Sequence, residues 1–219
     1  MIASIAALVV LQSAPNILTA AEKRDGWKLL FDGKTTNGWH NFKAKSIGKG
    51  WVVKDGALVC ADPETAGDIV TNDKYKWFDL RVEIKMETGQ NSGIMYHVAD
   101  DGGATWQSGP EIQIYDHKQQ EGVETTGFLY QLYGSKVDAA KPAGQWNQLR
   151  IVVNKDKCWT EVNGVKYYEY VLGSEEFLGR IAKSKFSEYP NFGRMGVGTI
   201  ALQGDHGVVA FRNMKIKEL

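Results

Sequence analysis

The segment Phe78-Asp-Leu-Arg-Val-Glu-Ile-Lys-Met86 is the part of this chain from which the fold can be inferred. Apolar residues occupy every second position, and Asp, Arg, Glu and Lys stand between them. Side chains of a β-strand point alternately to its two faces, so this pattern predicts a strand with one face in a core and the other in water. Such one-sided strands are typical of antiparallel sheets.

Further strands are predicted on both sides of this segment. Asp55-Gly56 and Asn163-Gly164 each stand between two strand-like runs, and such pairs favour tight hairpin turns. The other strand-like segments are Trp27–Phe31, Asp68–Thr71, Gly93–Val98, Glu111–Tyr115, Thr126–Tyr133, Trp146–Val153, Gly198–Gln203 and Val208–Ile216. Many short strands predict an all-β fold, an antiparallel two-sheet sandwich that forms a single domain over residues 25–219.

Helices are predicted at two places only. Thr19 and Glu22 have the spacing of a capping box, so a short helix is expected over residues 20–24. Ser174, followed by two glutamates, begins the one longer helix, expected over residues 174–186. Its apolar residues, Phe177, Ile181 and Phe186, would pack against the sandwich.

Composition narrows the range of functions. The formal net charge of the 219 residues is +0, so no nucleic-acid partner is expected. Seven tryptophans are many for this length, and aromatic faces stack on sugar rings, although core packing will account for most of them. The two cysteines, Cys60 and Cys158, are expected to be separate buried thiols rather than a disulfide.

The N-terminus suggests export. Residues 1–14 are small and apolar, and they are too short to form a stable membrane span. Their length suits the apolar centre of a secretory signal, although no Lys or Arg precedes them. We therefore expect residues 1–20 to include a signal segment and the mature protein to be periplasmic or secreted.

The segment Ser108-Gly-Pro-Glu-Ile-Gln-Ile-Tyr-Asp-His117 is the predicted centre of the chemistry. Alternation places Glu111, Gln113 and Tyr115 on one face of a strand and two isoleucines on the other. Neighbours on one face lie roughly 7 Å apart, so a carboxylate, an amide and a phenol can converge on one sugar. An ordinary solvated sheet face is the alternative interpretation.

Several common kinds of active site are not indicated. The chain has no Gly-x-Ser-x-Gly elbow and no paired Cys-x-x-Cys motif. Sandwich glucanases carry Glu-x-Asp-x-x-Glu, but Gln113 stands here where the middle carboxylate would be, so a two-carboxylate glycosidase is disfavoured. Of the four histidines, His97 at a strand end and His206 in a glycine-flanked loop are the better candidates for a site.

Several short motifs, taken together, carry a family resemblance. They are Leu29–Gly33 with Gly38-Trp39, Asn91–Ile94, Gly109–Gln113, Lys141–Gly144 with Trp146-Asn147, Asn163-Gly164, Ala182–Phe186, Ile200–Gln203, His206-Gly207 and Phe211–Asn213. By their order and spacing, the chain resembles the 3-keto-disaccharide hydrolase family, long known as DUF1080, from about Asp25 to Leu219. The resemblance implies a concanavalin A-like jelly-roll sandwich and an exported bacterial enzyme that cleaves 3-keto-glycosides.

The resemblance also implies a mechanism and a site. A base removes the C2 proton beside the C3 ketone, the C1 substituent leaves by β-elimination, and water adds to the enone. Glu111 or a histidine would be the base, and His206 or a divalent metal ion would hold the enolate oxygen, with His97 nearby. His117, Gln119 and Gln120 depart from the expected loop, which would weaken metal binding.

Substrate contacts are expected from a second set of residues. Gln113 and Gln203 would bind the small-molecule carbohydrate, and Tyr96, Tyr130 or Trp39 would stack on its ring or else belong to the core. Two other functions remain open, a non-catalytic carbohydrate-binding module on the same sandwich and a conventional endo-glycosidase.

Overall fold

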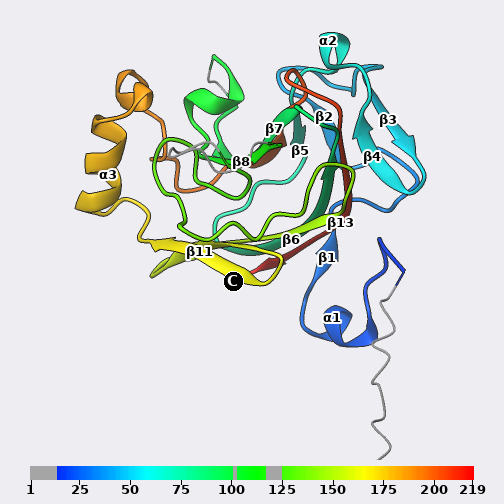
Figure 1. The fold of residues 1–219 in the computed structure, drawn as a ribbon, viewed down its shortest axis with the longest axis horizontal. Coiled ribbons are helices and arrows are strands. Elements are labelled where there is room, and N and C mark those ends of the chain that lie inside the picture. Colours follow the sequence, from blue (N-terminus) through cyan, green and yellow to red (C-terminus); the bar gives the residue numbers. More distant parts are fainter. Residues whose placement is uncertain (1–13, 101–102, 117–124) are drawn as a thin grey trace, which may run out of the picture.

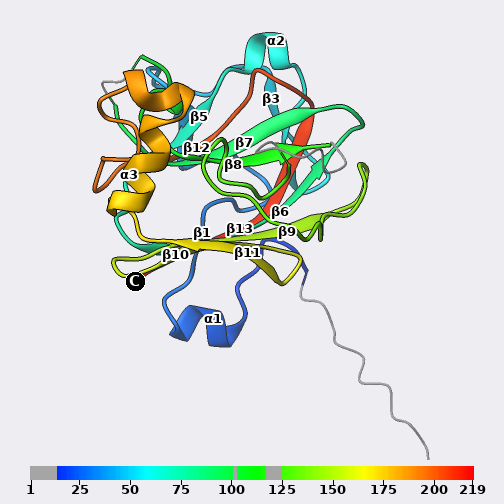
Figure 2. The same cartoon turned by 60° about the vertical axis from the view of Figure 1, so that its left-hand side comes forward.

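The computed structural model describes residues 14–100, 103–116 and 125–219. Two antiparallel sheets lie against each other, with the C-terminus and residues 20–24 on the side of the larger sheet (Figure 1), and the turned view separates the two layers (Figure 2). The predicted all-β sandwich of concanavalin A-like jelly-roll type is confirmed. Most of the expected signal segment (residues 1–13), together with His117, Gln119 and Gln120, lies outside the described residues.

The larger sheet has eight strands. Its order is β11-β10-β9-β6-β13-β4-β3, and β1 pairs with β13 beside this path. The strands are β1 (Lys28–Leu29), β3 (Trp51–Lys54), β4 (Ala57–Cys60), β6 (Phe78–Met86), β9 (Asn147–Val153), β10 (Cys158–Val162), β11 (Val165–Tyr170) and β13 (Val209–Glu218).

The smaller sheet has five strands in the order β2-β5-β12-β7-β8. They are β2 (Trp39–Asn41), β5 (Ile69–Thr71), β7 (Asn91–Val98), β8 (Glu111–Tyr115) and β12 (Thr199–Leu202). Since β8 lies at one edge of this sheet, the segment predicted to carry the chemistry has a sheet neighbour, β7, on one side only.

Strand β6 is the centre of the larger sheet and behaves as its alternation predicts. It pairs with β9 on one side and β13 on the other. Its apolar residues, from Phe78 to Met86, are each at most 4% exposed and belong to the main core cluster. The core thus lies between the sheets, against the apolar face of β6.

Both predicted hairpins are present. Asp55-Gly56 joins β3 to β4, and Asn163-Gly164 joins β10 to β11. All four turn residues have positive φ, between 49° and 83°. A turn with two positive-φ residues matches the twist of the strands it joins, which is why Asp-Gly and Asn-Gly pairs are favoured there.

Helices occupy the periphery. They are α1 (Ala20–Arg24), α2 (Pro63–Ala66), α3 (Glu175–Ala182) and the 3₁₀ helices η1 (Thr105–Gln107) and η2 (Lys185–Glu188). The predicted helix over 174–186 divides into α3 and η2, because the extended backbone of Ser184 starts a new helix and its hydroxyl accepts from Phe186 N. No helix in the described part of the chain is long and apolar enough to span a bilayer.

The N-terminal segment packs on the sandwich. Asn16 donates to Gly56 O at 2.8 Å and accepts from Asn213 N at 2.7 Å. Helix α1 follows the predicted capping box at Thr19, and its Glu22 pairs with the buried Lys215 at 2.8 Å. Asn16 and helix α1 therefore both contact the larger sheet and its hairpin.

Two strand predictions need correction. Residues 126–133 form no regular strand. They run irregularly along the edge of β8, where Gly127 N donates to Gln113 O and Tyr130 N donates to Glu111 O. Positive φ at Gly127 and Gln131 interrupts the extended backbone. The predicted strand Trp27–Phe31 is also shorter, since only Lys28–Leu29 pairs in the sheet.

The two cysteines are separate buried thiols, as predicted. The Cys60 thiol contacts Gly204 O, and the Cys158 thiol contacts Asn154 O. Burial raises the pKa of the Cys60 thiol to about 12, so it is an inert structural group.

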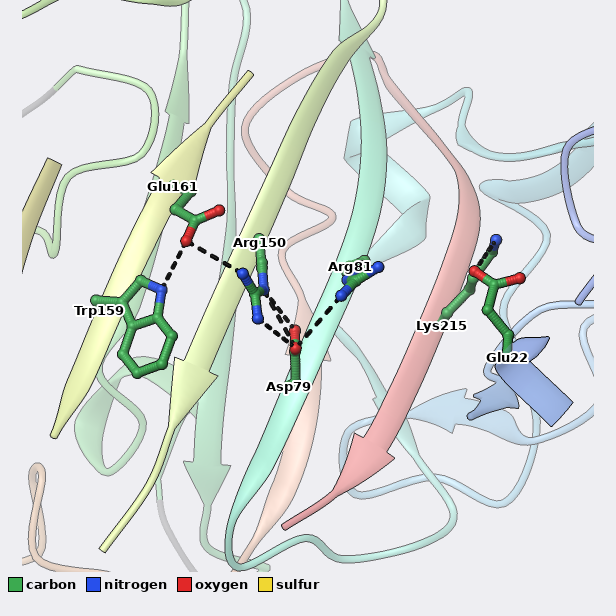
Figure 3. A network of polar contacts seen from close by, with 7 residues as sticks. All are labelled: Glu22, Asp79, Arg81, Arg150, Trp159, Glu161 and Lys215. Atoms are coloured by element: carbon green, nitrogen blue, oxygen red, sulfur yellow. Dashed lines mark hydrogen bonds and ion pairs between the residues drawn. The ribbon is translucent and has the colours of Figure 1, made fainter. Parts of the chain in front are cut away.

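A polar network holds the outer face of the larger sheet together (Figure 3). The Asp79 carboxylate, 6% exposed, accepts from Arg150 Nη2 at 2.8 Å and from Arg150 Nε at 3.0 Å. Arg150 also reaches Glu161 at 3.2 Å, and Glu161 accepts from Trp159 Nε1 at 2.9 Å. Three neighbouring strands, β6, β9 and β10, are thereby joined by charge across their exposed face.

We predict that Asp79→Ala destabilises the fold by about 2 kcal/mol, because Arg150 keeps only one of its two carboxylate partners. The free energy of unfolding in urea measures this. Asp156→Ala is the matched control, since this carboxylate is 84% exposed and should change stability by less than about 0.5 kcal/mol. Equal stability of the two variants would contradict the prediction.

Candidate active site

Strand β8 presents its polar residues on the face of the smaller sheet that is turned away from the core. Ile112 and Ile114 belong to the core cluster, and Glu111 and Gln113 alternate with them. In the antiparallel pair, Glu111 lies opposite Met95, Gln113 opposite Gly93, and Tyr115 opposite Asn91. Asn91 therefore lies beside Tyr115 on this face.

A cavity of about 380 Å³ lies on this face of the sheet. Five residues predicted to bind or transform the substrate line it: Glu111, Gln113, Tyr130, Gln203 and His206. Five more complete the lining: Asn91, Trp106, Tyr115, Lys185 and Phe186. The cavity is thus built from β7, β8, the loop after β12, η1, η2 and the irregular segment along the β8 edge.

Glu111 is more enclosed than an ordinary sheet face allows. It is 7% exposed and Gln113 is 4% exposed, although both line the cavity. The cause is the diagonal neighbour of Glu111 in β7: a Cβ at Gly93 would lie 2.6 Å from Glu111 Cδ. Because Gly93 has no side chain, the Glu111 carboxyl lies flat across the neighbouring strand.

Burial makes Glu111 a weak acid. Burial, together with the nearby negative charges of Asp68 and Asp205 and against the opposing charge of Lys185, raises the pKa of the Glu111 carboxyl to about 8. An isolated carboxylate is strongly disfavoured in such surroundings, so the neutral acid is the main form at pH 7. Raised carboxyl pKa values of this kind are characteristic of proton-transfer sites.

Two amide oxygens in the lining point to a ligand. The side chain of Gln203 is 7% exposed, and its Oε1 meets no hydrogen-bond donor within the described residues. The Oδ1 of Asn91 is in the same situation. Leaving a buried acceptor unpaired costs about 1–3 kcal/mol, and the hydroxyl groups of a sugar would supply the missing donors.

The loop after β12 carries His206 and is held by the half-buried carboxylate of Asp68. Asp68 Oδ1 accepts from Gly204 N at 3.0 Å, and Asp68 Oδ2 accepts from the Thr105 hydroxyl. Burial raises the pKa of Asp68, which these two hydrogen bonds oppose. Within the loop, His206 Nδ1 bonds to Asp205 Oδ1. Asp68 thus connects the His206 loop to η1, which carries Trp106.

His97 is not part of this cavity. Strict alternation would turn its side chain toward Glu111, but His97 has φ 54°, and the pairing of β7 with β12 shifts by one residue there. This bulge turns the imidazole toward the Phe78 and Tyr96 rings, and His97 Nε2 bonds to Lys76 O at 2.8 Å. At 1% exposed, and with its pKa lowered by burial, it is a neutral structural residue.

Two of the predicted stacking residues belong to the core instead. Tyr96 is 1% exposed, and its hydroxyl bonds to that of Tyr170 at 2.6 Å. Trp39 is 5% exposed and donates from Nε1 to Leu30 O at 2.7 Å. Tyr130 alone of the three lines the cavity. Trp106, which the sequence did not single out, also lines it and offers a large aromatic surface to a sugar face.

A metal site is not visible in the described part of the chain. Across residues 14–100, 103–116 and 125–219, no three His, Cys, Asp or Glu side chains gather closely enough to hold an ion. The divalent metal ion remains a prediction from the sequence.

A jelly-roll sandwich with a sugar-sized pocket, a buried carboxyl and an imidazole is typical of enzymes that act on carbohydrates. The model of the 3-keto-alpha-glucoside-1,2-lyase-like domain family matches residues 26–217, and the chain belongs to this family. The resemblance inferred from the short motifs is thereby confirmed, and the protein is a glycoside-cleaving enzyme.

Two similar proteins support this assignment, and a third shares the fold. The 3-keto-disaccharide hydrolase of Bacteroides thetaiotaomicron is 30% identical over 230 residues, which cover 89% of this chain and 79% of the relative. A crystal structure of a candidate glycosyl hydrolase from Parabacteroides distasonis has a TM-score of 0.85 at 30% identity and covers 94% of this chain and 100% of its own. The Bacillus subtilis carbohydrate-binding module CBM66, at 9% identity and a TM-score of 0.51, covers 81% of this chain and 94% of its own and shares the fold alone.

We predict that Gly93→Ala displaces the Glu111 carboxyl and lowers turnover about 100-fold, because a misplacement of roughly 1 Å at a catalytic group has an effect of this size. Steady-state rates and a crystal structure of the variant measure both effects. Gly179→Ala is the control, since nothing lies within 4 Å of the Cβ it would add. Normal turnover of Gly93→Ala, with Glu111 in place, would refute the positioning role.

The raised pKa of Glu111 predicts a pH-dependent stability. The carboxyl binds its proton more tightly in the folded state, with a pKa of about 8 against an ordinary 4.5. The contribution of Glu111 to the free energy of unfolding is therefore fully present below about pH 4.5. It falls as pH rises toward 8, by about 1.4 kcal/mol for each pH unit between the two pKa values. Glu111→Gln cannot ionise and should lose this dependence.

Urea unfolding between pH 5 and pH 9 measures the effect. The difference in unfolding free energy between Glu111→Gln and the wild type should widen in favour of the variant as pH rises. Glu64→Gln, at an exposed position, should follow the wild type at every pH. A constant difference between Glu111→Gln and the wild type would show that Glu111 titrates normally.

Proposed function

We propose that this enzyme cleaves 3-keto-glycosides, including 3-keto-disaccharides, by elimination and rehydration. One observation carries the proposal: the buried Glu111 carboxyl, with its raised pKa, shares a sugar-sized cavity with the His206 imidazole. These are two proton-carrying groups of different kinds, as a reaction with a proton removal and a proton delivery requires. The name of the Bacteroides thetaiotaomicron relative, 3-keto-disaccharide hydrolase, supports the same substrate class.

Hydrolysis through paired carboxylates is poorly supported. Retaining and inverting glycosidases use two carboxyl groups roughly 5–9.5 Å apart on either side of the scissile bond. Among the described residues that line the cavity, Glu111 is the one carboxyl, and Gln113 beside it carries an amide. An amide can neither attack C1 nor activate a water as a base. A ketone at C3 removes the need for that second carboxylate.

The ketone changes the chemistry by acidifying the neighbouring C2 hydrogen. Removal of the C2 proton leaves an enolate whose electron pair can expel the substituent on C1. The departing glycosidic oxygen takes a proton, and water then adds to C1 of the resulting enone while C2 is reprotonated. The sum of these steps is hydrolysis, and each needs a proton carrier or a hydrogen-bond donor in the pocket.

The remaining lining residues suit the binding of one sugar ring. Gln203 and Asn91 offer unpaired acceptors for hydroxyl hydrogens, and Gln113 offers an amide that can both donate and accept. Tyr130 and Trp106 supply aromatic surface for the ring face. This mixture of a few convergent polar groups and aromatic walls is typical of small-molecule sites.

Export and a metal requirement belong to the proposal as well. The small apolar residues 1–14 support secretion to the periplasm or the medium. Cell fractionation of a producing bacterium, with N-terminal sequencing of the product, tests this. A divalent ion would help to hold an enolate oxygen, and a chelator arm in the activity assay tests that part.

The decisive experiment compares a 3-keto-glycoside with the same glycoside unoxidised. We expect release of the C1 substituent from the keto form only, and a loss of about 100-fold or more in Glu111→Ala, because the group handles a proton or a developing charge. Glu64→Ala, at an exposed position, should be unaffected. Cleavage of the unoxidised glycoside would point to an ordinary glycosidase, and binding without cleavage to a carbohydrate-binding module.

A further inference from the structure

The loop that brings His206 to the cavity contains an Asp–His pair. His206 lines the cavity, and its Nδ1 bonds to Asp205 Oδ1. An ionised carboxylate can only accept a hydrogen bond, so Nδ1 carries the ring proton and Nε2 of the neutral ring keeps its lone pair. In such a pair the carboxylate fixes the tautomer of the histidine and stabilises the imidazolium that forms when the histidine acts as a base.

We propose that the Asp205–His206 pair removes the C2 proton and that Glu111 acts as a neutral acid, donating a hydrogen bond to the C3 ketone oxygen. The inference rests on the proposed function and deepens it, because it assigns the two proton carriers to different atoms of one substrate. Asp205 is a positioning residue in this scheme, since it acts through His206.

The surroundings of the two groups separate their roles. Glu111 is 7% exposed, whereas the His206 side chain is 49% exposed at the rim of the cavity. The charged groups that act on Glu111 are Asp68, held by Thr105 and Gly204, together with Asp205 and Lys185. Two negative charges and burial outweigh one lysine, so the pKa of Glu111 rises to about 8 and the group keeps its proton at pH 7.

Other ionisable groups around the cavity do not reverse this balance. Tyr115 on β8 and Tyr130 on the neighbouring segment also line the cavity, and neither brings a further carboxylate to Glu111. Lys185 Nζ lies 4.5 Å from the centre of the Tyr130 ring and 3.3 Å from its hydroxyl oxygen, so the lysine charge interacts with Tyr130. A protonated carboxyl in an enclosed site is well suited to hold an oxyanion.

The bonds broken and formed in these steps balance with water as the one co-reactant. The C2–H bond breaks, its proton goes to His206 Nε2, and its electron pair forms a C2–C3 double bond while the carbonyl pair moves to the C3 oxygen. That oxygen is held by the Glu111 O–H. The carbonyl then re-forms and a C1–C2 double bond appears. The C1–O bond breaks with its electron pair on the glycosidic oxygen, and this oxygen takes the proton from His206 Nε2. Water adds to C1, and C2 regains a proton.

The exposure of His206 makes the assignment measurable. A base at the rim exchanges its proton with solvent, so incubation of a 3-keto-glycoside in D₂O should place deuterium at C2, as NMR can detect. Turnover should fall as pH rises past about 8, since Glu111 then ionises and can no longer donate. Turnover that instead rises through pH 8 would make Glu111 the base and overturn the inference.

Two variants test the roles separately. Asp205→Asn should lower kcat and C2 exchange by about 100-fold or more, with KM within about threefold, because His206 loses the carboxylate that orients it as a base and no substrate-binding group is removed. The alkaline fall in turnover should also move to lower pH, since Asp205 raises the pKa of Glu111. Asp156→Asn, which removes an exposed carboxylate on the β9–β10 turn, is the matched control.

Glu111→Gln keeps a neutral donor at the same place. It should retain turnover within about tenfold and lose the alkaline fall, whereas Glu111→Ala should lose about 100-fold. A loss above 100-fold in Glu111→Gln, or unchanged kinetics in Asp205→Asn, would refute the inference while wild-type cleavage of the keto substrate left the proposed function standing. Failure of the wild type on that substrate would overturn the function itself.

Discussion

The burial of one carboxyl group against a glycine organises the site. Glu111 lies across Gly93 in the β7–β8 pair, enclosed to 7% exposure, and this placement depends on the absence of a side chain in β7. Enclosure raises the pKa of the group to about 8 and so makes it able to carry a proton near neutral pH. The sandwich supplies the rigid strands on which such a placement can be held, and the loops supply the partners.

Those partners come from distant parts of the chain. The Asp68 carboxylate ties the His206 loop, 136 residues further on, to η1 through Thr105, 37 residues further on. Lys185 approaches from η2 and stands over Tyr130. Two ionised carboxylates near each other are unfavourable together, and the hydrogen bonds that the half-buried Asp68 accepts let it ionise more readily than the buried Glu111. The unequal environments of the two acids leave the proton on Glu111.

Much of the architecture could be predicted because it depends on local sequence patterns. The alternation of β6, the two hairpin turns with their positive φ values, and the capping box at Thr19 each depend on neighbouring residues only. Residues 126–133 failed as a strand because Gly127 and Gln131 leave the extended conformation while the segment still bonds to β8. Helix α3 ended early because Ser184 could cap a second, shorter helix.

The sequence by itself determined which face of β8 is polar, since alternation sets that face once the strand exists, and it singled out Glu111, Gln113 and His206. Only the tertiary structure decided which side chains meet them. A one-residue bulge sent His97 into the core, against the alternation that would have brought it to the cavity. The local sequence did not indicate the roles of Asp68, Trp106 and Lys185. Their hydrogen bonds and charges act on residues that are distant in the sequence and close only in the folded structure.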